Sequence, residues 1–438
     1  MRSLMPRPGT SVGVGLVMFA LAWYATGQPA SSGSHPSQPG AQPGAQPAAQ
    51  PPLDWAKEES GLLKNYVQLT KREQFVKAGE QYFNADASWI IFQAVPVPEA
   101  GQEPATAYLM YVAKVDRDHS GRVTGLSKIT KLSADGSANT CGWFDPVEPT
   151  RVIYGSTIDP PAPTNKPGYQ GPTGRYMWSF PREMEIVSQV PLPLWREVMA
   201  KRGEKIDEAL CGNTFLPRPI FTLDGYDAEC SFSRDAKWMI YTHVEEIPGE
   251  NGAPARPDAD LWVYKTATGE HRRIVKAPGY DGGPFISPDG AKICYRSDRK
   301  GNNELQLFIA DLEFDADAVP TGIKREHQLT DANVNWAPYW DPSGTFLIFA
   351  SSQFGHQNYE VVAIEADMNK PMSALRSRRI TSATGADVLP VFSNDGKLMM
   401  WTSQRAPKIE GEERPSSQIW CAEWIGGNDA RELFGGAN

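Results

Sequence analysis

Alternating apolar and polar positions between Gly279 and Leu312 predict three β-strands joined by two tight turns. The strands are expected at Pro284–Ser287, Lys292–Arg296 and Glu304–Asp311. The first turn is Pro288-Asp289-Gly290, in which the glycine adopts φ > 0 without steric cost. A single meander of this kind cannot bury its apolar faces alone, so the chain is expected to repeat it.

The pattern recurs in six copies, each aligned on an anchor residue that precedes the first turn. The anchors are Phe83, Phe144, Phe232, Ile286, Trp340 and Phe392. The last four are 52 to 54 residues apart, and the wider earlier gaps contain insertions. Before each anchor lies a short apolar–polar segment that supplies a fourth strand: 68–70, 128–130, 220–222, 273–275, 328–330 and 379–381. Six four-stranded units predict an all-β, six-bladed β-propeller of antiparallel blades around a central channel.

The repeats GYDGGPFISPDG, NWAPYWDPSG, DVLPVFSNDG and YDAECSFSRDA resemble the S-P-D-G blade repeats of TolB-like β-propellers. The turn Ser297-Asp298-Arg299-Lys300-Gly301 is similar to the S-x-R-x-G turn of such blades. The resemblance covers Asn65 to Ile425 and concerns turn and core residues, so it bears on architecture more than on function. It also implies that an N-terminal strand closes the ring. Two segments compete for that place, Tyr66–Thr70 and Ala430–Phe434.

The N-terminal residues predict export. Residues 1–27 combine Arg2 and Arg7, an apolar run from Val12 to Tyr24 and small residues, a pattern typical of a secretory signal peptide. An uncleaved anchor is the alternative, although the run is shorter than the roughly 20 residues of a bilayer span. Residues 28–53 are rich in Pro, Ala and Gln and predict a disordered tether, so the propeller is assigned to 54–438.

Two segments fall outside the strand pattern. DWAKEESGLLKNY predicts a short N-terminal helix, and LPLWREVMAKRGEKIDEALCG predicts a helical insertion at 191–219, between blades 2 and 3. The insertion would pack on a neighbouring blade, cap one face of the ring or bind a partner. In the second repeat, the third strand is expected at Arg175–Phe180, with Glu183–Ser188 beyond it.

One loop offers candidate metal ligands. Asp116, Asp118 and Ser120, followed by Gly121, match the start of a calcium loop, but its twelfth position is Ser127 rather than Glu. The competing interpretation is a polar hairpin turn. Calcium is the one ion that the sequence suggests, and no other cofactor is expected.

Charge and cysteine content narrow the function classes. The formal net charge is −9 over 438 residues, which argues against nucleic acid or an anionic membrane surface as partner. The odd count of five cysteines leaves at least one thiol without an intramolecular partner. Cys294 and Cys421 fit core strands, and one disulfide among Cys141, Cys211 and Cys230 is an open alternative. The chain contains no G-x-S-x-G, H-E-x-x-H, P-loop or dinucleotide fingerprint.

A shared polar position supplies the candidate binding site. Five residues before the anchors stand Asn139, Asp227, Asp281, Asn335 and Asp387, with Ala78 in the first repeat. By the strand order of the resembled family, these side chains would surround one mouth of the channel. Either each caps its own turn, or the three aspartates form a negative mouth for a cation or a basic peptide. Gly290, Gly344 and Gly396 are assigned to structural turns.

Two function classes remain from the sequence. The first is an exported, non-enzymatic, monomeric ring, periplasmic or secreted, without a membrane span after signal cleavage. It would bind a protein or peptide of the cell envelope through the channel mouth or one face. The second is a propeller lyase or hydrolase that acts on an exported or cell-wall-derived substrate. The second would need His, Arg and carboxylate side chains that converge in the channel.

Overall fold

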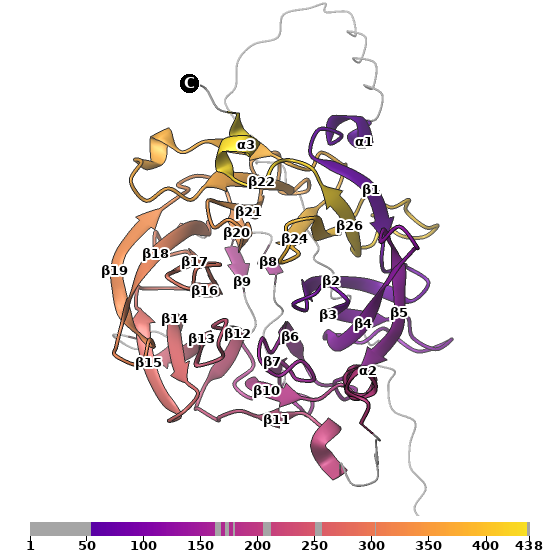
Figure 1. The fold of residues 1–438 in the computed structure, drawn as a ribbon, viewed down its shortest axis with the longest axis horizontal. Helices are drawn as coiled ribbons and strands as arrows, with labels where there is room; N and C mark the ends of the chain where they lie inside the picture. The colour runs from indigo at the N-terminus through magenta and orange to yellow at the C-terminus, as the bar shows by residue number, and fades with distance from the viewer. Residues whose placement is uncertain are drawn as a thin grey trace, which may run out of the picture.

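The computed structural model describes residues 54–162, 168–170, 175–177, 180–204, 212–249, 256–302 and 304–435, which form a ring of six four-stranded antiparallel sheets (Figure 1). The all-β, six-bladed architecture predicted from the repeats is therefore confirmed. The predicted signal and tether, residues 1–53, lie outside the described residues. No helix among the described residues is long and apolar enough to cross a membrane.

The first strand of each blade lies nearest the channel, and six blades follow in order around the ring (Figure 1). Blade 1 consists of β2 (Phe75–Phe83), β3 (Trp89–Pro96), β4 (Leu109–Arg117) and β5 (Val123–Lys131). Blade 2 consists of β6 (Asn139–Phe144), β7 (Val152–Ser156), β10 (Glu185–Gln189) and β11 (Arg218–Pro219). Blade 3 consists of β12 (Tyr226–Phe232), β13 (Trp238–Ile247), β14 (Arg256–Lys265) and β15 (Glu270–Val275).

Blade 4 consists of β16 (Asp281–Ile286), β17 (Lys292–Ser297), β18 (Gln306–Phe314) and β19 (Pro320–Gln328). Blade 5 consists of β20 (Asn335–Trp340), β21 (Phe346–Ser351), β22 (Glu360–Glu365) and β23 (Ser377–Arg379). Blade 6 consists of β24 (Asp387–Phe392), β25 (Leu398–Ser403), β26 (Gln418–Trp424) and β1 (Leu63–Gln68). Short 3₁₀ helices occur at Gly212–Phe215 and Met372–Ala374. All six predicted anchors are the last residues of the innermost strands, so the repeat alignment located the end of each strand.

The N-terminal strand closes the ring. β1 pairs antiparallel with β26, with Leu63 opposite Trp424 and Gln68 opposite Trp420. The competing segment forms helix α3 (Ala430–Phe434), which begins after Asp429 because that carboxylate accepts hydrogen bonds from the N–H groups of the first turn. The predicted N-terminal helix is α1 (Trp55–Glu58).

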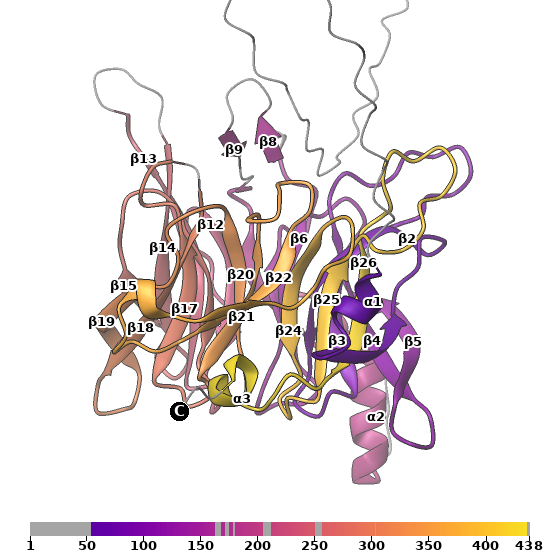
Figure 2. The ribbon, with the colours of Figure 1, turned by 90° about the horizontal axis from the view of Figure 1, so that it is seen from above.

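Blade 2 corrects two sequence predictions. Its third strand is β10, whereas β9 (Arg175–Met177) pairs with β8 (Gly168–Gln170) in a separate two-stranded sheet. Helix α2 (Leu192–Arg202) lies between β10 and β11, so the insertion is inside blade 2 and not between blades 2 and 3. The long gap before Phe232 thus contains two excursions, one on each side of β10. They leave from opposite faces of the ring (Figure 2).

The core lies between blades. Every residue of β21 and β25 is buried, because neighbouring blades cover both faces of each sheet. This explains why these strands are apolar runs such as FLIFAS rather than alternating patterns. Burying each large apolar side chain contributes about 1.5–3 kcal/mol.

Every innermost strand contains a β-bulge at the same place, three residues before the anchor. The residues at this position have positive φ: Glu80, Cys141, Glu229, Gly283, Ala337 and Leu389, at 48° to 59°. A bulge re-aims the local side chains and increases the twist of the strand. Here it turns six neighbouring segments toward the channel.

Candidate functional site

The five predicted polar residues mark one end of the channel. Asn139, Asp281, Asn335 and Asp387 are the first residues of their innermost strands, and Asp227 is the second residue of β12. Each lies opposite the last part of the neighbouring second strand, as in the pairs Asp281↔Ser297 and Asp387↔Ser403. This end of the channel is on the face of the ring from which β8 and β9 project (Figure 2).

The three aspartates are at most 1% exposed and hold partners within the protein. Asp281 Oδ1 accepts from Arg299 Nη2 at 2.9 Å, and Asp387 Oδ2 accepts from Arg405 Nη2 at 2.8 Å. Asp227 Oδ1 lies 2.8 Å from Nδ1 of His243. Burial raises the pKa of Asp281 to about 6, although the charge of Arg299 opposes this rise. These arginines neutralise much of the charge that a negative mouth would need.

The two asparagines among these five polar residues also make hydrogen bonds inside the blades. Asn139 Nδ2 donates to the carbonyl of Tyr108 at 3.0 Å, and Asn335 Nδ2 donates to the carbonyl of Ala332 at 2.8 Å. Asn335 also accepts from the hydroxyl of Ser351 at 2.8 Å. Ligand binding by the five polar residues at this mouth stays a prediction.

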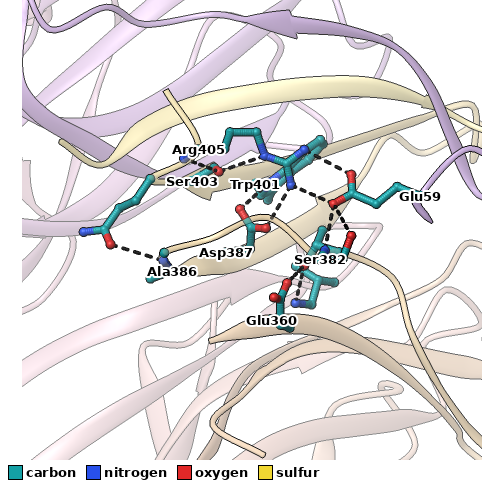
Figure 3. Close-up of polar contacts among 12 residues, drawn as sticks. Glu59, Glu360, Ser382, Ala386, Asp387, Trp401, Ser403 and Arg405 are labelled. Carbon is teal, nitrogen blue, oxygen red and sulfur yellow. Dashed lines mark hydrogen bonds and ion pairs between the residues drawn. The ribbon is translucent and has the colours of Figure 1, made fainter. Parts of the chain in front are cut away.

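Arg405 lies between Asp387 of blade 6 and Glu59 of the N-terminal segment (Figure 3), and four aromatic rings surround its guanidinium. Its side chain is 0% exposed, and its guanidinium lies 4.4 Å from the ring centroid of Trp55 and 4.8 Å from that of Trp401. The carboxylate of Glu59, just after α1, accepts from Arg405 and also from the backbone N–H of Ser382 at 2.7 Å. Arg405, in the turn Ser403-Gln404-Arg405 after β25, therefore links blade 6 to the N-terminal segment that contains the closing strand.

The candidate calcium loop is a hairpin between β4 and β5. Asp118 Oδ1 accepts from the N–H of Ser120 at 2.8 Å and from the N–H of Arg122 at 3.1 Å. Asp116 Oδ1 accepts from the hydroxyl of Ser127 at 2.5 Å. The contacts of Asp118 are those of an Asx turn, and the contact of Asp116 joins the two paired strands. In the part of the chain that the structure describes, no group of three or more His, Cys, Asp or Glu side chains is arranged to hold a metal ion.

The turn glycines and the cysteines can also be placed. Gly290, Gly344 and Gly396 have φ of 74°, 71° and 69° in the first hairpin of blades 4, 5 and 6. Cys141, Cys230, Cys294 and Cys421 are buried free thiols, and Cys211 lies outside the described residues.

Inside the channel, the bulges bring together a charged cluster that the sequence did not reveal. Glu229 accepts from the hydroxyl of Tyr280 at 2.6 Å, from the N–H of Gly283 at 2.6 Å and from Arg296 Nη2 at 3.2 Å. Glu80 accepts from the thiol of Cys141 at 2.8 Å. The sequence signal that could have revealed this cluster is the presence of Glu80 and Glu229 within predicted strands, because glutamate is rarely buried without partners.

Burial limits the reactivity of Glu80 and Cys141 in this cluster, because it raises the pKa of each. Burial raises the pKa of Glu80, which the hydrogen bond from Cys141 partly opposes. Burial and the nearby Glu80 charge raise the pKa of the Cys141 thiol well above its usual value, so the thiol is a poor nucleophile. The cavity next to these groups measures ≈ 20 Å³, enough for about one water.

Four aromatic rings separate this cluster from the other mouth. Tyr82, Trp143, Phe285 and Tyr339 come from four blades, each directly before its anchor, with neighbouring centroids 5.2 to 5.8 Å apart. We call this group the aromatic plug. The channel is therefore closed between the polar cluster and the opposite mouth.

Beyond the plug the channel widens into a cavity of ≈ 310 Å³, which we call the funnel. Its wall is formed by the six anchors or their neighbours, and its rim by the residues two positions after the anchors. The rim residues are Ala85, Pro146, Arg234, Pro288, Pro342 and Asn394. The innermost strands end on the face that carries α2 and α3, opposite β8 and β9 (Figure 2). The funnel opens on this face, because the residues at and after those strand ends line it.

These features define the protein as a six-bladed β-propeller with a plugged channel. No protein-family profile and no curated protein matches the chain. It is similar to a solved structure assigned as TolB from Agrobacterium tumefaciens, at 14% identity over 80% of this chain and 90% of that one, with a TM-score of 0.43. TolB from Acinetobacter baumannii is 15% identical over 79% of this chain and 66% of that one, with a TM-score of 0.43.

An oligogalacturonate lyase from Vibrio parahaemolyticus is similar to the same degree. It shows 11% identity over 82% of this chain and 93% of that one, with a TM-score of 0.40. Neighbours this distant, with different activities, do not assign a function. The propeller assignment rests on the six sheets of this chain.

Proposed function

We propose that this protein is exported to the cell envelope, where it binds a protein or peptide partner through the funnel. The observation that carries the proposal is the funnel itself, a solvent-open cavity of ≈ 310 Å³ to which all six blades contribute apolar or aromatic residues. Concave, mainly apolar sites with few polar groups are the usual form of ligand sites. The N-terminal signal pattern supports a periplasmic or secreted location.

Binding is favoured over catalysis by the space available around the charged groups. The enzyme alternative requires carboxylates and an arginine that converge where a substrate fits. Glu80, Glu229 and Arg296 do converge, but the adjoining cavity of ≈ 20 Å³ holds about one water. The larger cavity lies across the aromatic plug from these side chains.

The proposal is tested by blocking the funnel. Ala85→Trp places an indole on the exposed rim, and Thr268→Trp places one on the exposed β14–β15 turn at the outer edge of the ring as a matched control. Cross-linked capture from the envelope fraction should recover the same partner with wild type and Thr268→Trp, and lose it with Ala85→Trp. Identical recovery with all three proteins, at equal thermal stability, would refute binding through the funnel.

A further inference from the structure

The funnel has a closed floor, which limits what can enter it. Neighbouring rings of the plug lie 5.2 to 5.8 Å apart across the channel, and the cavity directly behind them measures ≈ 20 Å³. An extended polypeptide cannot pass this point. A chain that enters must therefore end in the funnel or reverse within ≈ 310 Å³. The funnel is about fifteen times as large as the cavity that holds about one water, and this space suits one chain end better than a two-stranded turn.

Two charged residues line the funnel, and only one of them is available to pair with a ligand. Asp145 is buried, and its carboxylate accepts from Arg151 Nε at 2.8 Å and from the N–H groups of Val147 and Glu148 at 2.8 and 2.7 Å. Arg234 is exposed on the rim and makes no hydrogen bond or ion pair within the described part of the chain. The funnel thus combines aromatic and apolar residues from all six blades with a few small polar side chains, such as Ser231 and Asn394, and with one available guanidinium.

A guanidinium pairs most favourably with a carboxylate, because its planar N–H groups match both oxygens. A side-chain carboxylate would carry its charge at the tip, directed at the apolar plug. At a C-terminus, by contrast, the carboxylate and the last side chain diverge from one Cα atom. The side chain can then enter the aromatic funnel while the carboxylate stays at the rim.

Resting on the proposed function, we infer that the funnel receives the C-terminus of a partner polypeptide whose last side chain is large and apolar. Its α-carboxylate pairs with Arg234. The last side chain packs on Trp143, Phe285 and Tyr339 of the plug, and the preceding residues leave past the three rim prolines.

The test is an affinity selection with two random hexapeptide pools, one with free C-termini and one with C-terminal amides. The purified protein is compared with Arg234→Gln and with Lys237→Gln, which removes an exposed cation from the same turn. Wild type and Lys237→Gln should enrich free-acid peptides that end in large apolar residues. Loss of the charged partner should reduce this enrichment about tenfold or more in Arg234→Gln.

The inference is overturned if amidated and free-acid peptides are enriched equally, if Arg234→Gln keeps the preference, or if neither pool is enriched. These outcomes are distinct from failure of the proposed function. If Ala85→Trp abolishes partner capture from the envelope while Arg234→Gln does not, the funnel binds its partner without reading a C-terminus.

Discussion

The carboxylate of Glu59 lies 3.0 Å from Nη1 of Arg405, although 346 residues separate them in the sequence. Both side chains are buried, and Arg405 is also bound by Asp387. This contact joins the segment that follows α1 to the last blade, where β1 completes the sheet. Ring closure therefore depends on a buried ion pair as well as on strand pairing.

Glu59→Gln should weaken this closure, because it leaves the buried guanidinium with one carboxylate instead of two. We expect a loss of about 2–4 kcal/mol in the free energy of unfolding. Urea denaturation followed by tryptophan fluorescence measures it. Glu58→Gln, an exposed change on the adjacent helix residue, is the control, and an equal effect of both substitutions would contradict the role of Glu59.

A different kind of cost is expected at the turn glycines. A Cβ at Gly290 would meet no atom within 4 Å, so Gly290→Val acts through its φ of 74° alone. We expect a loss of about 1–3 kcal/mol in stability from backbone strain. Gly322→Val, in a strand with ordinary φ and open space, should be nearly neutral by thermal unfolding. Equal melting temperatures for Gly290→Val and Gly322→Val would contradict this assignment.

The repeats predicted the ring because the same turn and anchor pattern recurs six times, with the last four anchors 52 to 54 residues apart. The closing strand could not be selected, since Tyr66–Thr70 and Ala430–Phe434 both carry short apolar patterns. What distinguishes them is the N-cap Asp429, which favours a helix. In blade 2, the third strand was predicted at Arg175–Phe180 because this segment is rich in aromatic residues, which favour strands. The strand that forms the blade is instead Glu185–Gln189.

The candidate site was less accessible to sequence reasoning. The six bulge positions are occupied by Glu, Cys, Glu, Gly, Ala and Leu, so a shared left-handed backbone is not marked by a shared residue type. The charged cluster joins blades 1, 2, 3 and 4 through contacts such as Glu229–Arg296, 67 residues apart. Arg234 occupies a rim position that carries proline in three other repeats. Aligned repeats could have singled out Arg234 as the charged exception.

Stability should depend on pH through Glu185. Burial, with the charge of Asp227 as the next cause, raises the pKa of Glu185 from 4.5 to about 7. Between these values the folded state binds more protons than the unfolded state, so stability falls as pH rises from about 4.5 to about 7. The side chain is partly exposed, and we expect a decline of about 1 kcal/mol after solvent screening.

Glu185→Gln removes this titration. Urea unfolding at pH 5 and pH 8 should show a smaller decline for Glu185→Gln than for wild type, because every other titrating group is common to both proteins. Glu183→Gln, which removes a neighbouring exposed carboxylate, should show the same decline in stability between pH 5 and pH 8 as wild type. Parallel curves for wild type and Glu185→Gln would show that Glu185 titrates normally.

Substitution of the three aspartates at the other mouth of the channel distinguishes three interpretations in one experiment. Simple capping predicts that Asp227→Asn, Asp281→Asn and Asp387→Asn are nearly neutral, since an amide oxygen still accepts a hydrogen bond. A negative mouth predicts normal folding with loss of salt-sensitive cation or basic-peptide binding. The contacts with Arg299, Arg405 and His243 favour a third outcome, in which the combined variant is less stable. Each lost charged hydrogen bond should cost about 1–3 kcal/mol.

Thermal unfolding and calorimetric titration with calcium chloride therefore belong together. We expect a clear fall in the melting temperature of the triple variant and the same calcium heat as in wild type. Asp118→Asn, in the exposed β4–β5 hairpin, is the control for that loop and should leave both quantities unchanged. If the triple variant melted like wild type but lost a salt-sensitive calcium heat, the aspartates would act at the channel mouth and not as partners of the buried cations.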